Sequence, residues 1–231
     1  MTLPASGVIS MGQVNTELGR SATAQLSLND TEVRLLFAKP SGAISLSDGY
    51  GKPQYASQYP PAYNDTYVKA TSRWTDDEGV GEYYYPWLAF NPAISLTGIY
   101  PNKSWISANG STTNQRIHFN FGSAKIPRRI YYENSHYAGT YTNRGIYQFI
   151  LQGSNDADAF ANLNYEVDTN WTQLTVSQNT FDEHVAADVA DPKYINVSGV
   201  TGYQYCALKV ANARVSEFYM AVRRIELQTW V

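Results

Sequence analysis

Residues 116–229 contain a succession of short segments that alternate apolar and polar residues and end at turn-forming residues. Alternation with a period of two places successive side chains on opposite faces of a strand. No convincing helical pattern lies between these segments, so nothing resembles a parallel βαβ unit. A chain of this kind buries its apolar faces by stacking one antiparallel sheet on another, which predicts an all-β sandwich. The expected strands are 116–121, 127–132, 145–152, 171–176, 194–197, 203–210 and 221–229.

The first part of the chain has a different pattern, in which short helices replace strands. Ser10 precedes residues 11–18 and Gly19 follows them, which predicts a helix with a serine N-cap and a glycine after its end. A second helix is expected over residues 28–37, with two acidic residues in its first turn. Such a short segment buries little core, so we expect it to be stabilised by a partner protein, by other copies of itself or by the downstream domain.

These patterns divide the chain into three parts. Residues 1–51 form the partly helical N-terminal segment. Residues 52–65 are rich in proline and tyrosine and are expected to be an extended linker. Residues 66–231 form the strand-rich domain.

Charge and composition exclude several classes of protein. A net charge of −3 argues against binding to nucleic acid through phosphate contacts and against a polybasic membrane-surface protein. The apolar stretches are too short for a membrane-spanning helix, so no membrane insertion is expected. A single cysteine, Cys206, excludes an intrachain disulfide and a cysteine-based zinc site. The N-terminus lacks the basic and apolar regions of a secretory signal.

Residues that could support catalysis are few, and we expect no enzymatic activity. His118 is expected on the polar face of a strand and His184 in a solvated loop. The acidic residues 76–78 precede a glycine and are expected to form a solvated turn, although a glycosidase would need such carboxylates. Cys206 lies in an apolar strand and is expected to be an inert core thiol. A depolymerase is disfavoured because the chain shows no repeating strand coil.

Eight short motifs follow one another in order through residues 66–231. Residues 87–91 look like an Ala-Phe-Asp-Gly turn, residues 117–122 like an Ile-x-Val-Asp-Leu-Gly strand, and residues 149–156 like a Phe-x-Ile-x-Gly-Ser-x-Asp strand and turn. The remaining motifs are at 104–107, 125–130, 171–174, 203–208 and 224–227. In this order they resemble a discoidin-type domain, the galactose-binding-like jelly roll of coagulation-factor C domains and many carbohydrate-binding modules. The resemblance implies an eight-stranded jelly-roll sandwich.

The discoidin resemblance also implies a ligand site on loops at one end of the jelly roll. A sugar site needs aromatic faces for the apolar side of a pyranose and planar polar groups for its hydroxyls. Residues 74–85, 135–144 and 211–219 should converge there and carry such side chains. The expected stacking platforms are Tyr83 or Tyr84 and Tyr137, the expected polar groups are His136, Arg144 and Arg214, and Tyr141 and Tyr219 lie in the same loops.

A structural calcium ion ties loops together in many discoidin-like domains. The resemblance implies that Glu226 would be one ligand and that Asn91 would stand where the family has an aspartate. Pro92 replaces the glycine of that turn. An asparagine ligates calcium through its amide oxygen without adding charge, so any affinity should be reduced.

The N-terminal segment resembles a second family. Residues 9–20, 24–30 and 41–48 are similar to the N-terminal region of many tailed-bacteriophage tail and fibre proteins. The resemblance implies a component of a tail fibre, tail tip or baseplate that is assembled in the host cytoplasm. Its N-terminal segment would dock on other virion tail proteins, as a homo-oligomer, and its jelly roll would attach to a host cell-surface glycan. The alternative is a purely structural assembly or decoration module with no glycan ligand.

Overall fold

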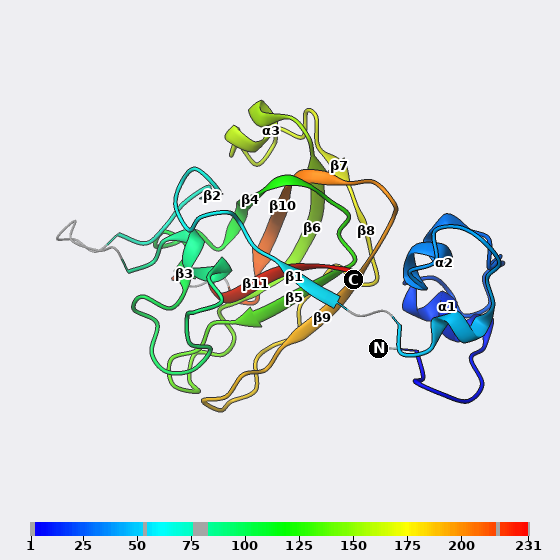
Figure 1. Ribbon diagram of the computed structural model, residues 1–231. Coiled ribbons are helices and arrows are strands. Elements are labelled where there is room, and N and C mark those ends of the chain that lie inside the picture. Colours follow the sequence, from blue (N-terminus) through cyan, green and yellow to red (C-terminus); the bar gives the residue numbers. More distant parts are fainter. Residues whose placement is uncertain (1–2, 53–54, 76–82, 216–217, 231) are drawn as a thin grey trace.

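Two antiparallel sheets stacked face to face form the body of the molecule, and a small helical unit lies beside one end of them (Figure 1). The computed structural model describes residues 3–52, 55–75, 83–215 and 218–230. No helix within these ranges is both long enough and apolar enough to cross a membrane.

The first sheet has the strand order β1-β11-β5-β9-β8, and β3 pairs separately with β11. The second sheet has the order β2-β4-β10-β6-β7. Every pairing between these strands is antiparallel. The strands are β1 (Tyr55–Gln58), β2 (Val68–Ala70), β3 (Trp105–Ile106), β4 (Thr113–Lys125), β5 (Arg129–Asn134), β6 (Ile146–Ser154), β7 (Thr172–Gln173), β8 (Thr175–Val176), β9 (Lys193–Ser198), β10 (Tyr203–Ala213) and β11 (Ala221–Trp230).

The core lies between the two sheets and confirms the expected all-β jelly-roll sandwich. Inward-facing residues alternate along the strands, as Ile117 and Phe119 do in β4, where both are fully buried. The ring of Phe181 stacks between those of Tyr132 and Phe149, with centroid distances of 3.8 and 4.4 Å. These rings join β5, β6 and the loop before β9, and so they fix the spacing of the sheets.

The segment 171–176, expected to be one strand, is two short strands in different sheets. β7 pairs with β6 in the second sheet, and β8 pairs with β9 in the first. Leu174 lies between them, buried, with its N–H donated to the Leu151 carbonyl at 2.9 Å. The chain therefore crosses from one sheet to the other at this residue.

The outer face of the second sheet is covered by α3 (Ala157–Ala161) and the residues that follow it. His118 points to this face as expected, but it is fully buried there, against the rings of Phe160 and Trp171. Its Nδ1 lies 2.9 Å from the Phe160 carbonyl oxygen. Burial lowers the pKa of His118 from 6.5 to about 4, so the ring is neutral at pH 7.

The N-terminal unit (residues 3–51) contains α1 (Met11–Glu17), α2 (Thr31–Leu36) and the 3₁₀ turn η1 (Leu46–Gly49). The expected serine cap is confirmed: Ser10 and Gln13 form a capping box at the start of α1. α2 begins three residues later than expected, after a turn in which the Asp30 N–H donates to the Ser27 carbonyl. The unit has a small core of its own, formed by Leu3, Ile9, Val14, Leu18, Val33, Leu36 and Phe37.

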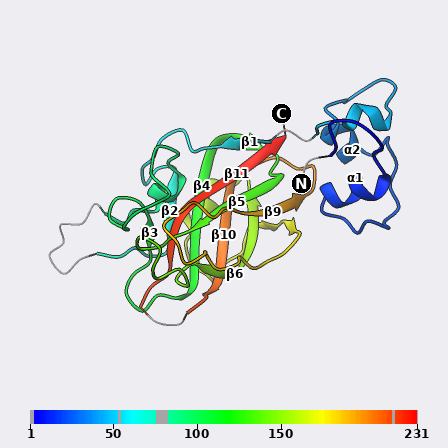
Figure 2. The same ribbon diagram turned by 90° about the horizontal axis from the view of Figure 1, so that it is seen from below.

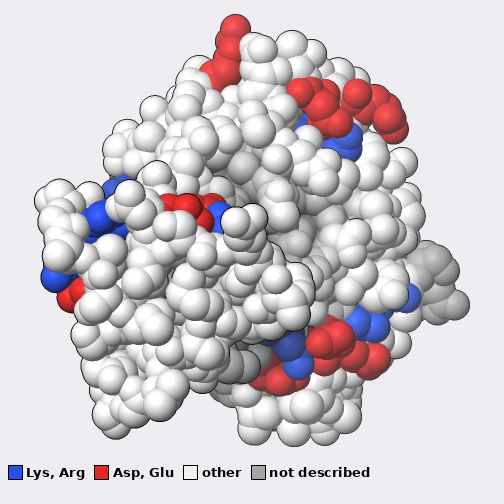
Figure 3. Space-filling view, turned by 90° about the vertical axis from the view of Figure 1, so that its right-hand side faces the viewer, with Lys and Arg blue, Asp and Glu red and all other residues white. Residues whose placement is uncertain are grey.

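The N-terminal unit is joined to the sandwich through the segment that was expected to be an extended linker. Residues 55–58 are strand β1, paired with the end of β11, so this part of the chain belongs to the first sheet. The Tyr55 hydroxyl donates to Glu17 at 2.7 Å, and the Ser198 hydroxyl donates to the Leu18 carbonyl at 2.8 Å. Trp230 packs against the core of the N-terminal unit. The face of the molecule on this side is largely uncharged, with charged side chains gathered in a few places (Figure 3).

Candidate functional site

The loops beside β3 and the β5–β6 connection lie at the end of the sandwich away from the N-terminal unit (Figures 1 and 2), and aromatic side chains of these segments contact one another. They come from the residues before β3, from the loop between β5 and β6, and from the residues before β11. We call this group the aromatic patch. It consists of Trp74, Tyr83, Tyr84, Tyr100, Tyr137, Tyr141, Phe218 and Tyr219.

The buried ring of Tyr100 lies at the centre of the patch. Its centroid is 5.2 Å from that of Tyr137 and 6.1 Å from that of Tyr219, both in edge-to-face geometry. Tyr219 packs in the same way against Trp74 at 5.3 Å, and Tyr137 against Tyr141 at 6.3 Å. Edge-to-face contacts of this kind hold aromatic rings in fixed relative orientations. The patch is therefore a connected network of rings.

Four of these rings are substantially exposed. The exposed fractions are 39% for Tyr83, 41% for Tyr137, 52% for Tyr141 and 55% for Phe218. Contiguous exposed apolar surface is costly in water and commonly marks a binding site. Tyrosine rings present a flat apolar face and a hydroxyl that can donate or accept, which suits a ligand with both apolar and hydroxylated sides.

Arg144 lies over the patch. The central carbon of its guanidinium is 4.2 Å from the ring centroid of Tyr141, 4.6 Å from that of Tyr219 and 5.1 Å from that of Phe218. Its Nη1 donates to the Tyr219 hydroxyl. The structure gives its side chain no ion pair and no further hydrogen bond with a described residue, so among those residues its other N–H groups are available to a ligand.

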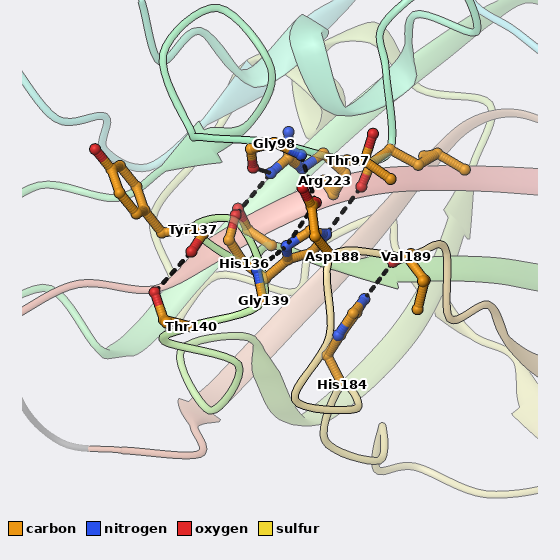
Figure 4. A network of polar contacts seen from close by, with 12 residues as sticks. Thr97, Gly98, His136, Tyr137, Gly139, Thr140, His184, Asp188, Val189 and Arg223 are labelled. Carbon is orange, nitrogen blue, oxygen red and sulfur yellow. Dashed lines mark hydrogen bonds and ion pairs between the residues drawn. The ribbon is translucent and has the colours of Figure 1, made fainter.

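A network of polar contacts directly behind Tyr137 fixes the loop that carries it (Figure 4). The His136 ring is fully buried; its Nδ1 accepts the Gly139 N–H at 3.0 Å, so its Nε2 donates to the Leu96 carbonyl at 3.0 Å. Burial lowers the pKa of His136, which favours this neutral form. We expected His136 to bind a ligand, but both ring nitrogens are engaged by the protein. The residue supports the loop instead.

The same network ties three more segments together. Arg223 of β11 donates through Nη2 to the carbonyls of Gly98 and His136, at 2.9 and 2.7 Å. Asp188 accepts the Gly98 N–H at 2.6 Å. His184, expected in a solvated loop, is instead buried against the His136 ring at 4.4 Å, because the 184–189 segment folds back over it. The loops under the patch are thus cross-linked to one another and to the sheet.

Arg214 lies apart from the patch contacts. Its guanidinium donates to the Phe181 carbonyl and lies 4.9 Å from the ring centroid of Tyr147. It therefore holds the loop before β9 against β10, and the structure does not place it as a ligand-binding group. Of the eight residues predicted to bind a ligand, the structure brings together Tyr83, Tyr84, Tyr137, Tyr141, Arg144 and Tyr219.

Sequence reasoning missed Tyr100, the centre of the patch. It follows the turn glycine Gly98 and precedes Pro101 in a segment without periodicity. The sequence signal that could have identified Tyr100 is an aromatic residue in a loop that contains glycine and proline.

The expected calcium ligands do not fit a metal ion. The buried carboxylate of Glu226 accepts hydrogen bonds from Tyr59, at 3.0 Å, and from Ser57, and it forms an ion pair with Arg224 at 3.2 Å. Arg224 also donates to the Ile94 carbonyl at 2.6 Å, so a guanidinium already links β11 to the turn after Asn91. The Asn91 amide oxygen accepts the Ala93 N–H at 3.0 Å. No cluster of three potential metal-ligating side chains occurs in the part of the chain that the structure describes.

Together, the strand order and the face-to-face packing of the two antiparallel sheets define the fold as an all-β jelly-roll sandwich. No protein-family model matches the sequence. No curated protein matches it either.

Several solved structures are similar to this chain at low sequence identity. A SusE-like protein has a TM-score of 0.53 at 11% identity, over 77% of this chain and 68% of that one. A family 32 carbohydrate-binding module of Clostridium perfringens, in complex with GalNAc-β-1,3-galactose, has a TM-score of 0.45 at 16% identity, over 69% and 91%. A chitosan-binding module of a Paenibacillus chitosanase/glucanase has a TM-score of 0.44 at 22% identity, over 74% and 98%.

Proposed function

We propose that this protein binds a glycan through the aromatic patch and Arg144, without catalysing a reaction on it. The observation that carries the proposal is the ring network around Tyr100, from which Tyr137 and Tyr141 present exposed faces beside a guanidinium with unused donors. Aromatic faces bind the apolar side of a pyranose, and an arginine binds its hydroxyls in pairs.

We further propose that the glycan belongs to a host cell surface and that the protein is part of a bacteriophage tail. The similarity of residues 9–48 to tail and fibre proteins supports this assignment, and the N-terminal unit would attach to other tail proteins. The patch lies at the opposite end of the sandwich from that unit, an arrangement that suits attachment at one end and recognition at the other (Figure 1). A purely structural module is the alternative, in which the patch would contact another virion protein.

Binding of the full-length protein to an array of bacterial surface polysaccharides tests the glycan proposal. Replacing Tyr141 by alanine should weaken binding about tenfold, because one stacking contact contributes about 1–1.5 kcal/mol. Replacing Arg144 by alanine should weaken it at least as much. Tyr194→Ala is the matched control, because Tyr194 is equally exposed, at 51%, but lies on the first sheet in β9.

The glycan proposal fails if no polysaccharide binds, or if the Tyr194 and Tyr141 variants bind alike. Phage particles assembled with the Arg144→Ala variant distinguish host attachment from a purely structural role. Normal assembly with lost adsorption supports host attachment, whereas failed assembly supports the structural alternative.

A further inference from the structure

A concave site lies where the N-terminal unit meets the sandwich. It is a groove of about 390 Å³ between the end of α2 and the turn from β4 to β5. Its lining includes Leu35 and Ala38 from the N-terminal unit and Ile126 and Trp230 from the sandwich. A volume of this size is at the lower end of the range for small-molecule sites.

Arg128 lines the groove and is only 3% exposed. Its guanidinium stacks on the Trp230 ring at 3.9 Å, and its Nη1 donates to the Gly199 carbonyl. Its Nη2 is buried and has no hydrogen-bond partner among the described residues. Burial lowers the pKa of Arg128 to about 10, so the group keeps its charge at neutral pH. A buried cation with an unused N–H is costly unless something binds it.

The described carboxylate that acts on Arg128 does not supply that partner. Glu32 attracts Arg128 electrostatically, but its two oxygens are already engaged. One pairs with Arg20, and the other accepts the Gly199 N–H at 2.9 Å. Among the described residues, Arg128 therefore has no paired anion.

A second cation, Lys125, also lines the groove and pairs with no described carboxylate. The described residues that line the groove include no aspartate or glutamate. Two cations set among apolar walls are complementary to a molecule with one negative group and an apolar body.

We propose that this groove binds an apolar molecule that carries a single carboxylate. The carboxylate accepts from Arg128 Nη2 and pairs with Lys125, and the apolar part lies against Leu35, Ile126 and Trp230. The free C-terminal end of a peptide with an apolar last residue has this chemistry, and so does a medium-chain fatty acid.

Isothermal titration of the full-length protein with N-acetyl-leucine and with octanoate tests the proposal and distinguishes the two sources. N-acetyl-leucinamide is the matched uncharged ligand and should bind at least tenfold more weakly than N-acetyl-leucine. Tighter binding of N-acetyl-leucine than of octanoate indicates a peptide end, and the reverse order indicates a fatty acid.

Three variants locate the site. Arg128→Gln should weaken binding at least tenfold and Lys125→Ala about threefold, whereas Lys52→Ala, a loss of the same charge outside the groove, should leave binding unchanged. Ala124→Trp changes an exposed groove residue, leaves both cations in place and should block binding by filling the space. The Ala124→Trp variant tests the proposal even if the Arg128→Gln variant does not fold.

The proposal is overturned if neither carboxylate binds, or if the leucinamide binds as tightly as N-acetyl-leucine. It is also overturned if a folded Ala124→Trp variant binds like the unaltered protein.

Discussion

Replacing Arg224 by methionine should destabilise the sandwich strongly. The pair with Glu226 is buried, with side-chain exposures of 6% and 9%, so its loss leaves a carboxylate without its counter-charge in a site that excludes water. Removing one partner of a buried pair costs about 3–5 kcal/mol. Ser57 and Tyr59 still donate to Glu226, which places the expected cost near the lower limit, about 3 kcal/mol. In a chain of this length that corresponds to a fall in melting temperature of about 6–12 °C.

Urea unfolding and thermal melting of the purified protein measure the effect. Lys39→Met is the matched control, because the pair of Lys39 with Asp48 is partly exposed and its loss should cost less than about 1 kcal/mol. Adding Glu226→Gln to the Arg224 variant removes the uncompensated charge and should recover about 1–2 kcal/mol.

The same measurements test whether the Arg224 guanidinium takes the place of the calcium ion that was expected to tie the loops together. Calcium and a chelator should both leave the melting temperature of the unaltered protein unchanged, because nothing in the Glu226 site is left to bind a metal. The reasoning is refuted if Arg224→Met lies within about 1 kcal/mol of the unaltered protein. It is equally refuted if calcium raises the melting temperature of the protein that retains Arg224.

Three further changes test other parts of the structure. The pKa of His118 is about 6.5 in the unfolded chain and about 4 in the folded protein, so the free energy of unfolding should fall by up to about 3 kcal/mol as the pH falls from 6.5 to 4. Urea titrations at several pH values should show this fall, and His118→Phe should remove it. Cys206 is fully buried and its pKa is raised, so a thiol reagent should react only at the rate of unfolding; fast labelling in native buffer would contradict this placement. Gly139 has φ +83°, and a Cβ there would lie 2.8 Å from the backbone of Ala187. Gly139→Ala should therefore displace the loop of Tyr137 and weaken glycan binding, while the sandwich still melts cooperatively. An unchanged affinity would show that the position of this loop does not matter for binding.

The sandwich could be predicted from the sequence because its long strands alternate apolar residues that face the core, such as Ile117 and Phe119, with polar residues on the opposite face, such as His118. The strands that were missed, such as β1 and β3, have four residues or fewer, too few to show a period. The sequence predicts a linker at β1 because the composition there is that of an extended chain, and only the pairing with β11 makes it part of a sheet. Local composition does not reveal such long-range pairing.

The sequence predicts which residue types form the candidate site but not which of their side chains face solvent. Tyr137 and Tyr141 were found because they are aromatic residues in a glycine-containing loop, and loops carry binding sites. His136 is their neighbour in sequence and faces the other way, since its ring nitrogens satisfy backbone groups of two loops. Which side of a loop faces solvent depends on contacts between segments far apart in the chain, such as that of Arg223 with Gly98. Sequence patterns alone do not specify those contacts.

The position of β1 has a mechanical consequence. Its four residues lie in antiparallel register with the last strand, from Tyr55 opposite Trp230 to Gln58 opposite Leu227. Tension between an attachment at the N-terminal unit and a ligand at the far tip would pull β1 along its own axis. Hydrogen bonds that run across the strands are then loaded in shear and must break together rather than one after another. In a protein attached in this way, the pairing of β1 with β11 would let the junction carry a pulling force.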